Sequence, residues 1–146
     1  MRFLPVLLIL LLTSCGSGRS APDDGGPDTI RALESISYHR SGGLAGTSDH
    51  ITVSRTGTVQ VSGRLFGEAN TLLSEFQMMQ LARLFEGWEK LADHYPAERG
   101  AADDFVTEIR YGDKTVVASD AARGTPEHFL RVKQRLESLV RDLEGK

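Results

Sequence analysis

Two short segments of the chain alternate apolar and polar residues, as β-strands do when one face is buried. They span residues 50–54 and 58–62, and Arg55-Thr56-Gly57 between them is typical of a tight turn. The alternation therefore predicts a β-hairpin with one face directed into the core. The core residues of this hairpin would be Ile51, Val53, Val59 and Val61.

Three other segments have the composition of strands. The first begins within residues 30–40 and is expected to run for about seven residues, ending near His39-Arg40. The second and third, residues 104–111 and 114–119, flank Gly112-Asp113, which fits a two-residue hairpin turn. One face of the second strand would be formed by Phe105, Thr107, Ile109 and Tyr111.

Two segments space their apolar residues as amphipathic helices do. The first begins at Ser74, which forms a capping box with Gln77. Gly87 lowers the helix propensity near its end, and Tyr95-Pro96 stops any continuation of the helix. The second is expected to be capped by Thr125, with Pro126 at its first position. The apolar stripes are Phe76, Met79, Leu81, Leu84, Phe85 and Trp88 in the first helix, and Phe129, Val132, Leu136, Leu139, Val140 and Leu143 in the second.

The predicted element order is β-β-β-α-β-β-α, with residues 66–73 left irregular. Two hairpin turns favour an antiparallel sheet, and each helix has one apolar face that must be covered. We therefore expect a single α+β domain over residues 30–146, with an antiparallel sheet of about five strands and two helices packed on it. At helical spacing, Phe85 and Trp88 are expected to pack in the core, with Tyr95 nearby, rather than to line a ligand pocket.

The first residues have the pattern of an export signal. Met1-Arg2 carries one positive charge, and Phe3–Leu12 is an apolar run of ten residues, too short for the roughly 20 that span a bilayer. Leu12-Thr13-Ser14-Cys15 then resembles the lipobox of bacterial lipoproteins. This resemblance implies a signal peptide over residues 1–14, cleavage before Cys15 and attachment of acyl chains to that cysteine, which would anchor the protein to a membrane.

The segment after Cys15 lacks large apolar residues. Residues 16–29 are rich in Gly, Ser, Pro and Asp, so residues 15–29 are expected to act as a lipidated cysteine followed by a flexible tether. Gly16 stands where an aspartate often retains lipoproteins in the inner membrane. We therefore expect a lipid-anchored protein of the cell envelope, on the outer membrane and facing the periplasm in a Gram-negative bacterium.

Charge and cysteine content narrow the functional classes. The formal net charge is −3, which argues against a nucleic-acid partner and against a second, electrostatic attraction to membranes. Cys15 is the only cysteine, so the domain is expected to be held by packing without disulfides. No cofactor is expected.

The residues whose side chains could take part in catalysis or metal binding do not form a recognisable catalytic set. The four histidines have no metal-ligand spacing; pairing of the strands would bring His39 and His50 together, but ordinary surface or core roles are favoured over a shared metal. Ser41 is followed by two glycines but is not part of the Gly-x-Ser-x-Gly pattern of a nucleophile elbow. The aspartates that bound strands and turns are assigned local backbone roles; they are Asp103, Asp104, Asp113 and Asp120. We therefore expect neither an enzyme nor a metal site.

The glycine-rich segment Ser41-Gly42-Gly43-Leu44-Ala45-Gly46 has more glycine than a hairpin connection needs. Glycine permits positive φ and a close approach of the backbone to another surface. Leu44 would then be an apolar residue offered at an exposed loop tip. The competing interpretation is a long connection without a binding role.

Residues 38–46, Tyr-His-Arg-Ser-Gly-Gly-Leu-Ala-Gly, resemble the Arg-x-Gly-Gly-hydrophobic-Ala-Gly segment of emfourin-like proteins. Residues 104–111 and the closing helix from Pro126 to Leu143 are similar to later parts of that family. Emfourin-like proteins are small bacterial inhibitors of thermolysin-like zinc metalloproteases such as protealysin. The lipoprotein signal departs from the family pattern and would change where such a protease is met.

The resemblance implies a protein-binding domain rather than a catalytic one. The partner-binding residues would be Arg40, Ser41, Gly42, Gly43, Leu44, Ala45 and Gly46. Leu44 would fill the protease pocket for a bulky apolar side chain, and Arg40 would pair with a carboxylate at the rim. The alternative is an envelope lipoprotein that docks on another envelope protein in a structural or assembly role, without inhibitory activity.

Overall fold

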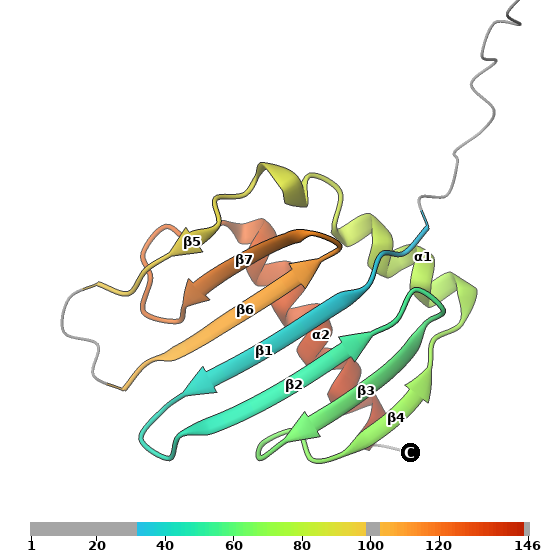
Figure 1. The fold of residues 1–146 in the computed structure, drawn as a ribbon, viewed down its shortest axis with the longest axis horizontal. Helices are drawn as coiled ribbons and strands as arrows, with labels where there is room; N and C mark the ends of the chain where they lie inside the picture. The colour runs from blue at the N-terminus through green and yellow to red at the C-terminus, as the bar shows by residue number, and fades with distance from the viewer. Residues whose placement is uncertain (1–31, 99–102, 145–146) are drawn as a thin grey trace, which may run out of the picture.

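A computed structural model describes residues 32–98 and 103–144, which form a mixed seven-stranded sheet with two α-helices on one face (Figure 1). The α+β class and the two helices are as expected. The strands are β1 (Ile36–Gly42), β2 (Thr47–Val53), β3 (Thr58–Gly63), β4 (Ala69–Leu72), β5 (His94–Tyr95), β6 (Phe105–Tyr111) and β7 (Lys114–Ser119). The helices are α1 (Glu75–Leu84), the short 3-10 helix η1 (Trp88–Lys90) and α2 (Glu127–Glu144).

β1 lies in the middle of the sheet, whose order is β4-β3-β2-β1-β6-β7-β5. It pairs antiparallel with β2 from Ile36 opposite Val53 to Gly42 opposite Thr47, and with β6 over the same length. The two predicted hairpins are present: β2 and β3 are joined by the turn at residues 54–57, and β6 and β7 by Gly112-Asp113. β1 itself ends at Gly42, two residues later than predicted.

The prediction of about five strands, all antiparallel, is wrong in two respects. β4 lies in the segment predicted to be irregular, where Asn70 and Leu72 are exposed and backbone pairing with β3 forms the strand. β5 has only two residues and pairs parallel with β7. Neither strand has an apolar alternation of its own; each is a short edge strand held by backbone pairing to a single neighbour.

The core lies between the sheet and the helices and matches the predicted apolar faces. The four hairpin residues are buried, as are most of the α2 stripe and the inward residues of β6. Tyr38, also fully buried, donates from its hydroxyl to Glu137 Oε1 of α2 at 2.7 Å. Burial and this carboxylate raise the pKa of Tyr38 far above its ordinary value, so the phenol stays neutral and links β1 to α2.

The helices differ from prediction at two boundaries and in the exposure of one residue. The capping box of Ser74 and Gln77 is present, but α1 ends at Leu84 and the chain passes through Gly87, with φ +82°, into η1. Phe76 lies outside the core and is 62% exposed, because the buried face of α1 is centred on Leu81 and Ala82 instead. The hydroxyl of Thr125 donates to the carbonyl of Ala122, and α2 begins one residue later than expected.

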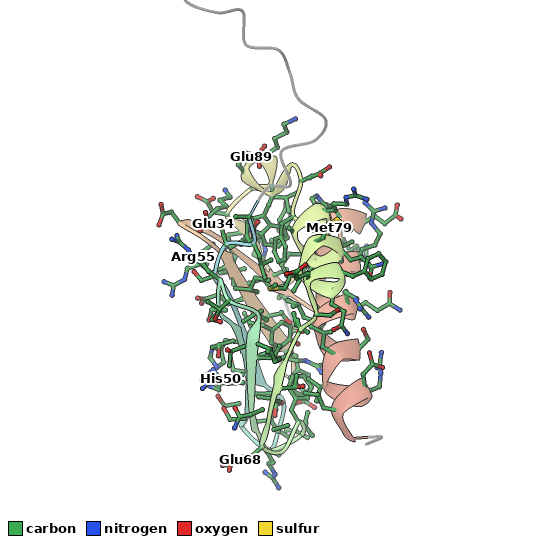
Figure 2. All side chains as sticks on the ribbon, turned by 90° about the vertical axis from the view of Figure 1, so that its right-hand side faces the viewer. Glu34, His50, Arg55, Glu68, Met79 and Glu89 are labelled. Carbon is green, nitrogen blue, oxygen red and sulfur yellow. The ribbon has the colours of Figure 1, made fainter. Side chains whose placement is uncertain are left out.

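The domain has two distinct ends along the strand direction. One end, the proximal end, carries the start of the described chain at Ala32 together with the turns at residues 54–57 and 112–113; the other, the distal end, carries the loops at residues 43–46 and 64–68. Figure 2 shows Glu34, Arg55 and Glu89 at the proximal end and Glu68 at the distal end. It also shows the helices covering one face of the sheet only.

The predicted signal peptide, Cys15 and the tether lie outside the described residues. Residues 32–98 and 103–144 contain no helix with the length and hydrophobicity of a membrane span.

Candidate functional site

The glycine-rich segment forms a tight turn at the distal end, between β1 and β2. Ser41 and Gly42 belong to β1, so the connection is residues 43–46. The Gly46 N–H donates to the Gly43 carbonyl at 3.0 Å, and Gly46 takes φ +56° to bring the chain into β2. Thr47 Oγ1 donates to the Gly42 carbonyl at 3.0 Å and closes the base of the turn.

Leu44 projects into solvent from this turn. Its exposed fraction is 93%, the largest among the exposed large apolar residues of the described chain, and Ala45 and Gly46 beside it are also exposed. The condition on which the loop hypothesis depended, an apolar side chain outside the core, is therefore met.

The base of the loop rests on the start of β6, where glycine is sterically required. Gly42 has φ +127°, and a Cβ at this position would lie 2.1 Å from the carbonyl oxygen of Asp104. The Gly43 N–H donates to the same oxygen at 3.2 Å, and the Phe105 ring covers Gly43. Two consecutive glycines thus allow the backbone to contact β6 closely and fix the direction of the loop.

Arg40 faces the side of the sheet that carries α2. Its guanidinium forms an ion pair with Asp120 at 3.1 Å and lies 4.2 Å from the centre of the Phe105 ring. Asp120 also pairs with Lys133 of α2. Arg40 therefore packs on the Phe105 ring, which covers Gly43 at the base of the loop. The positive charge of Arg40 is already paired with Asp120 inside the domain.

A second loop, residues 64–68, lies beside the first. The Arg64 guanidinium donates to the carbonyl of Ala45 at 3.3 Å, and Leu65 is 53% exposed. We call Leu44, Ala45, Arg64 and Leu65 together the distal surface. Arg64 and Leu65 could not be found from the sequence, because residues 64–68 show no periodic pattern.

The second loop is held by Asp49, a fully buried carboxylate on β2. Asp49 Oδ1 accepts hydrogen bonds from the backbone N–H groups of Leu65 at 2.8 Å and Phe66 at 3.4 Å. Asp49 was overlooked as a site residue. A signal was present, since the aspartate occupies an inward position of the alternating strand, two residues before Ile51.

Replacing Asp49 with alanine should lower the free energy of unfolding by about 2 kcal/mol, because two buried N–H groups lose a charged acceptor. Asp49→Asn is the matched control, since its amide oxygen can still accept from Leu65. Urea denaturation followed by circular dichroism measures both variants. Equal stability of the alanine and asparagine variants would contradict this role for Asp49.

The other candidate residues occupy separate positions. His39 and His50 lie side by side on the helix-free face, His94 is exposed on β5, and His128 Nε2 contacts the Leu84 carbonyl at 2.6 Å. Within the part of the chain that the structure covers, no group of three or more His, Cys, Asp or Glu side chains could hold a metal ion. Asp104 has a longer-range role than the local one expected of it, because its Oδ1 accepts from the Ala121 N–H, 17 residues away, at 3.1 Å.

The distal surface therefore presents two apolar side chains, Leu44 and Leu65. The two loops that carry them are held by the close contact at Gly42 and by hydrogen bonds from Arg64 and to Asp49. Such a rigid surface suits recognition of another molecule. Comparison of the sequence with models of known protein families and with curated proteins finds no match.

Proposed function

We propose that this chain is a bacterial lipoprotein, anchored by lipid on Cys15, whose domain binds a protein partner through the distal surface and inhibits thermolysin-like metalloproteases. The observation that carries the proposal is the exposure of Leu44 on a loop fixed at its base. The resemblance of residues 38–46 to emfourin-like inhibitors names the class of protease.

The inhibitory step needs an apolar side chain that enters a pocket without unfolding the inhibitor. Thermolysin-like enzymes favour a bulky apolar residue just after the bond that they cut. Leu44 would occupy that pocket while residues 43–46 lie along the substrate groove. Because Gly42 and Gly43 contact Asp104 and Phe105, the loop loses little conformational entropy on binding.

The position of the distal surface also supports the proposal. The chain enters the domain at Ala32, and β1 then runs away from this point to Gly42 (Figure 1). Seven strand residues at about 3.3 Å each separate the two ends of β1 by roughly 20 Å. An anchor on Cys15 would therefore leave Leu44 at the end of the domain farther from the anchored segment.

A role for Arg40 at the rim of the protease has less support than one for Leu44. The Arg40 guanidinium already faces Asp120 and the Phe105 ring. Arg64, which lies beside Ala45 on the distal surface, is better placed for a carboxylate of the partner. We therefore assign Leu44 and Leu65 the apolar contacts and Arg64 the charged one.

The proposal is tested with residues 15–146 carrying Cys15→Ser, assayed against a thermolysin-like protease with a peptide substrate. Leu44→Asp should raise the inhibition constant by at least roughly thirtyfold, since a central apolar contact contributes about 2 kcal/mol or more. Leu72→Asp is the matched control, because Leu72 is 68% exposed but sits at the proximal end of β4. If Leu44→Asp inhibits as well as the unsubstituted protein, this mechanism is discarded.

A second candidate function is docking on an envelope protein without inhibition. It is favoured by a groove of about 530 Å³ at the proximal end, lined by Leu33, Phe76, Met78 and Met79 among others. A photo-crosslinking residue placed at position 44 or at position 76 separates the two functions in intact cells. Adducts at position 44 support the distal surface, whereas adducts at position 76 alone support docking through the groove.

A further inference from the structure

His39 and His50 form a pair on the helix-free face of the sheet. They are directly opposite each other in the ladder between β1 and β2. Their imidazole rings are stacked, with centres 4.2 Å apart and planes inclined by 3°. Figure 2 shows His50 on the side of the sheet away from the helices; its side chain is exposed, and that of His39 is half-buried.

Ser48 shows that the two rings present the same nitrogen to one point. Its Oγ lies 3.1 Å from His39 Nε2 and 3.0 Å from His50 Nε2. A hydroxyl has a single proton, so it donates to one imidazole and accepts an N–H from the other. Both Nε2 atoms therefore converge on one small region above the sheet, held there by two adjacent strands.

We propose that His39 and His50 form a binding site for a divalent transition-metal ion such as Zn²⁺. Imidazole nitrogen is a preferred ligand of such ions, at metal–nitrogen distances of about 2.0–2.1 Å. Each ring turns about its Cβ–Cγ bond, a soft torsion, so that both Nε2 lone pairs meet the ion in place of the Ser48 proton. Water completes the coordination.

The surroundings favour a cation at this point. Glu108 is opposite His39 on β6, on the same face of the sheet, and Ser62 is opposite His50 on β3. A carboxylate on the neighbouring strand contributes negative potential near the pair. The row across the four strands thus combines two imidazole side chains with one carboxyl group and one hydroxyl.

Binding of the ion would join β1 to β2 next to the loop that they support. Ser48 is the second residue after Gly46, and His39 is the fourth before Gly43. An ion held by both strands stabilises the native hairpin over the unfolded chain in proportion to its occupancy. This inference stands independently of the proposed protease inhibition, because it rests on His39, His50 and Ser48, none of which belongs to the distal surface.

The test is calorimetric titration of Zn²⁺ into residues 15–146 carrying Cys15→Ser, a substitution that removes the only thiol. His39→Gln and His50→Gln should each weaken binding by at least roughly tenfold, since loss of even an outer partner of a metal ligand typically costs 10–100-fold. His94→Gln is the matched control: His94 is exposed on β5, and its loss should leave the titration unchanged.

A second readout distinguishes the pair from nonspecific binding. Saturating Zn²⁺ should raise the melting temperature of the unsubstituted domain, and this rise should disappear in both glutamine variants but persist in Ser48→Ala. Both histidines are on the solvent face, so their replacement is expected to leave the fold intact. Absence of Zn²⁺ binding, or binding that is equal in the His39→Gln, His50→Gln and His94→Gln variants, would overturn the proposal.

Discussion

Gly42→Ala is expected to lower the free energy of unfolding by about 3 kcal/mol and to weaken inhibition. A methyl group at this position would lie 2.1 Å from the carbonyl oxygen of Asp104, so β1 and the start of β6 must separate. The backbone also has φ +127°, a conformation that costs a residue with a side chain about 1–3 kcal/mol. Displacement of the loop base would move Leu44 away from its fixed direction.

Gly46→Ala is the matched control for this prediction. Gly46 also has a positive φ, +56°, but a Cβ there would meet nothing within 4 Å. Only the left-handed conformation is penalised, at about 1–2 kcal/mol. Urea denaturation of the two variants, with the inhibition assay run in parallel, measures the difference. Equal losses of stability would show that the contact with Asp104 is not what requires glycine at position 42.

Trp88→Ala is expected to lower the free energy of unfolding by about 3–5 kcal/mol, the range for removal of a large buried aromatic side chain. Trp88 is only 1% exposed and packs between Phe85, with ring centres 5.1 Å apart, and Phe129 of α2, at 5.9 Å. Its indole N–H donates to the Lys114 carbonyl at 3.4 Å. The residue therefore joins η1, β7 and α2 at the proximal end of the core.

The comparison variant for Trp88 is Phe76→Ala. Phe76 is an aromatic residue of the same predicted helical stripe, but its side chain is largely exposed. Its truncation should change stability by no more than about 0.5 kcal/mol. Thermal and urea denaturation measure both variants. If Phe76→Ala destabilises as much as Trp88→Ala, the assignment of Phe76 to the surface is wrong.

The elements that the sequence predicted well are those whose pattern is local. Alternation in residues 50–62 predicted the β2–β3 hairpin and its buried face, and the spacing from Phe129 to Val140 predicted the inner face of α2. β4 and β5 could not be predicted in this way. They are short edge strands without an apolar alternation, and they are defined by backbone pairing with β3 and β7.

The same distinction applies to the candidate site. Glycines at positions 42, 43 and 46 marked the loop, because the residue type itself reports an unusual backbone. The contacts that complete the distal surface are not visible in the sequence. Asp49 reaches Leu65 across 16 residues and Arg64 reaches Ala45 across 19, and both contacts follow from the register of β2 and β3.

The histidine pair shows an intermediate case. The sequence indicated that His39 and His50 would approach if their strands paired, and the register places them opposite each other. The hydroxyl of Ser48 between their Nε2 atoms could not be foreseen, since it depends on side-chain rotation above the sheet. The Ser48 hydroxyl shows that both Nε2 atoms face the same point, which is the geometric basis for proposing a bound ion.

The two edges of the sheet restrict how any partner can attach. β4 has four residues and β5 has two, and Pro96 directly follows β5. Edges this short offer few free backbone groups, which protects a sheet against edge-to-edge aggregation and against recruitment of an added strand. These short edges therefore disfavour β-augmentation, in which an extended peptide pairs with an edge strand as an added strand. A partner is left with side chains and turns as its points of attachment.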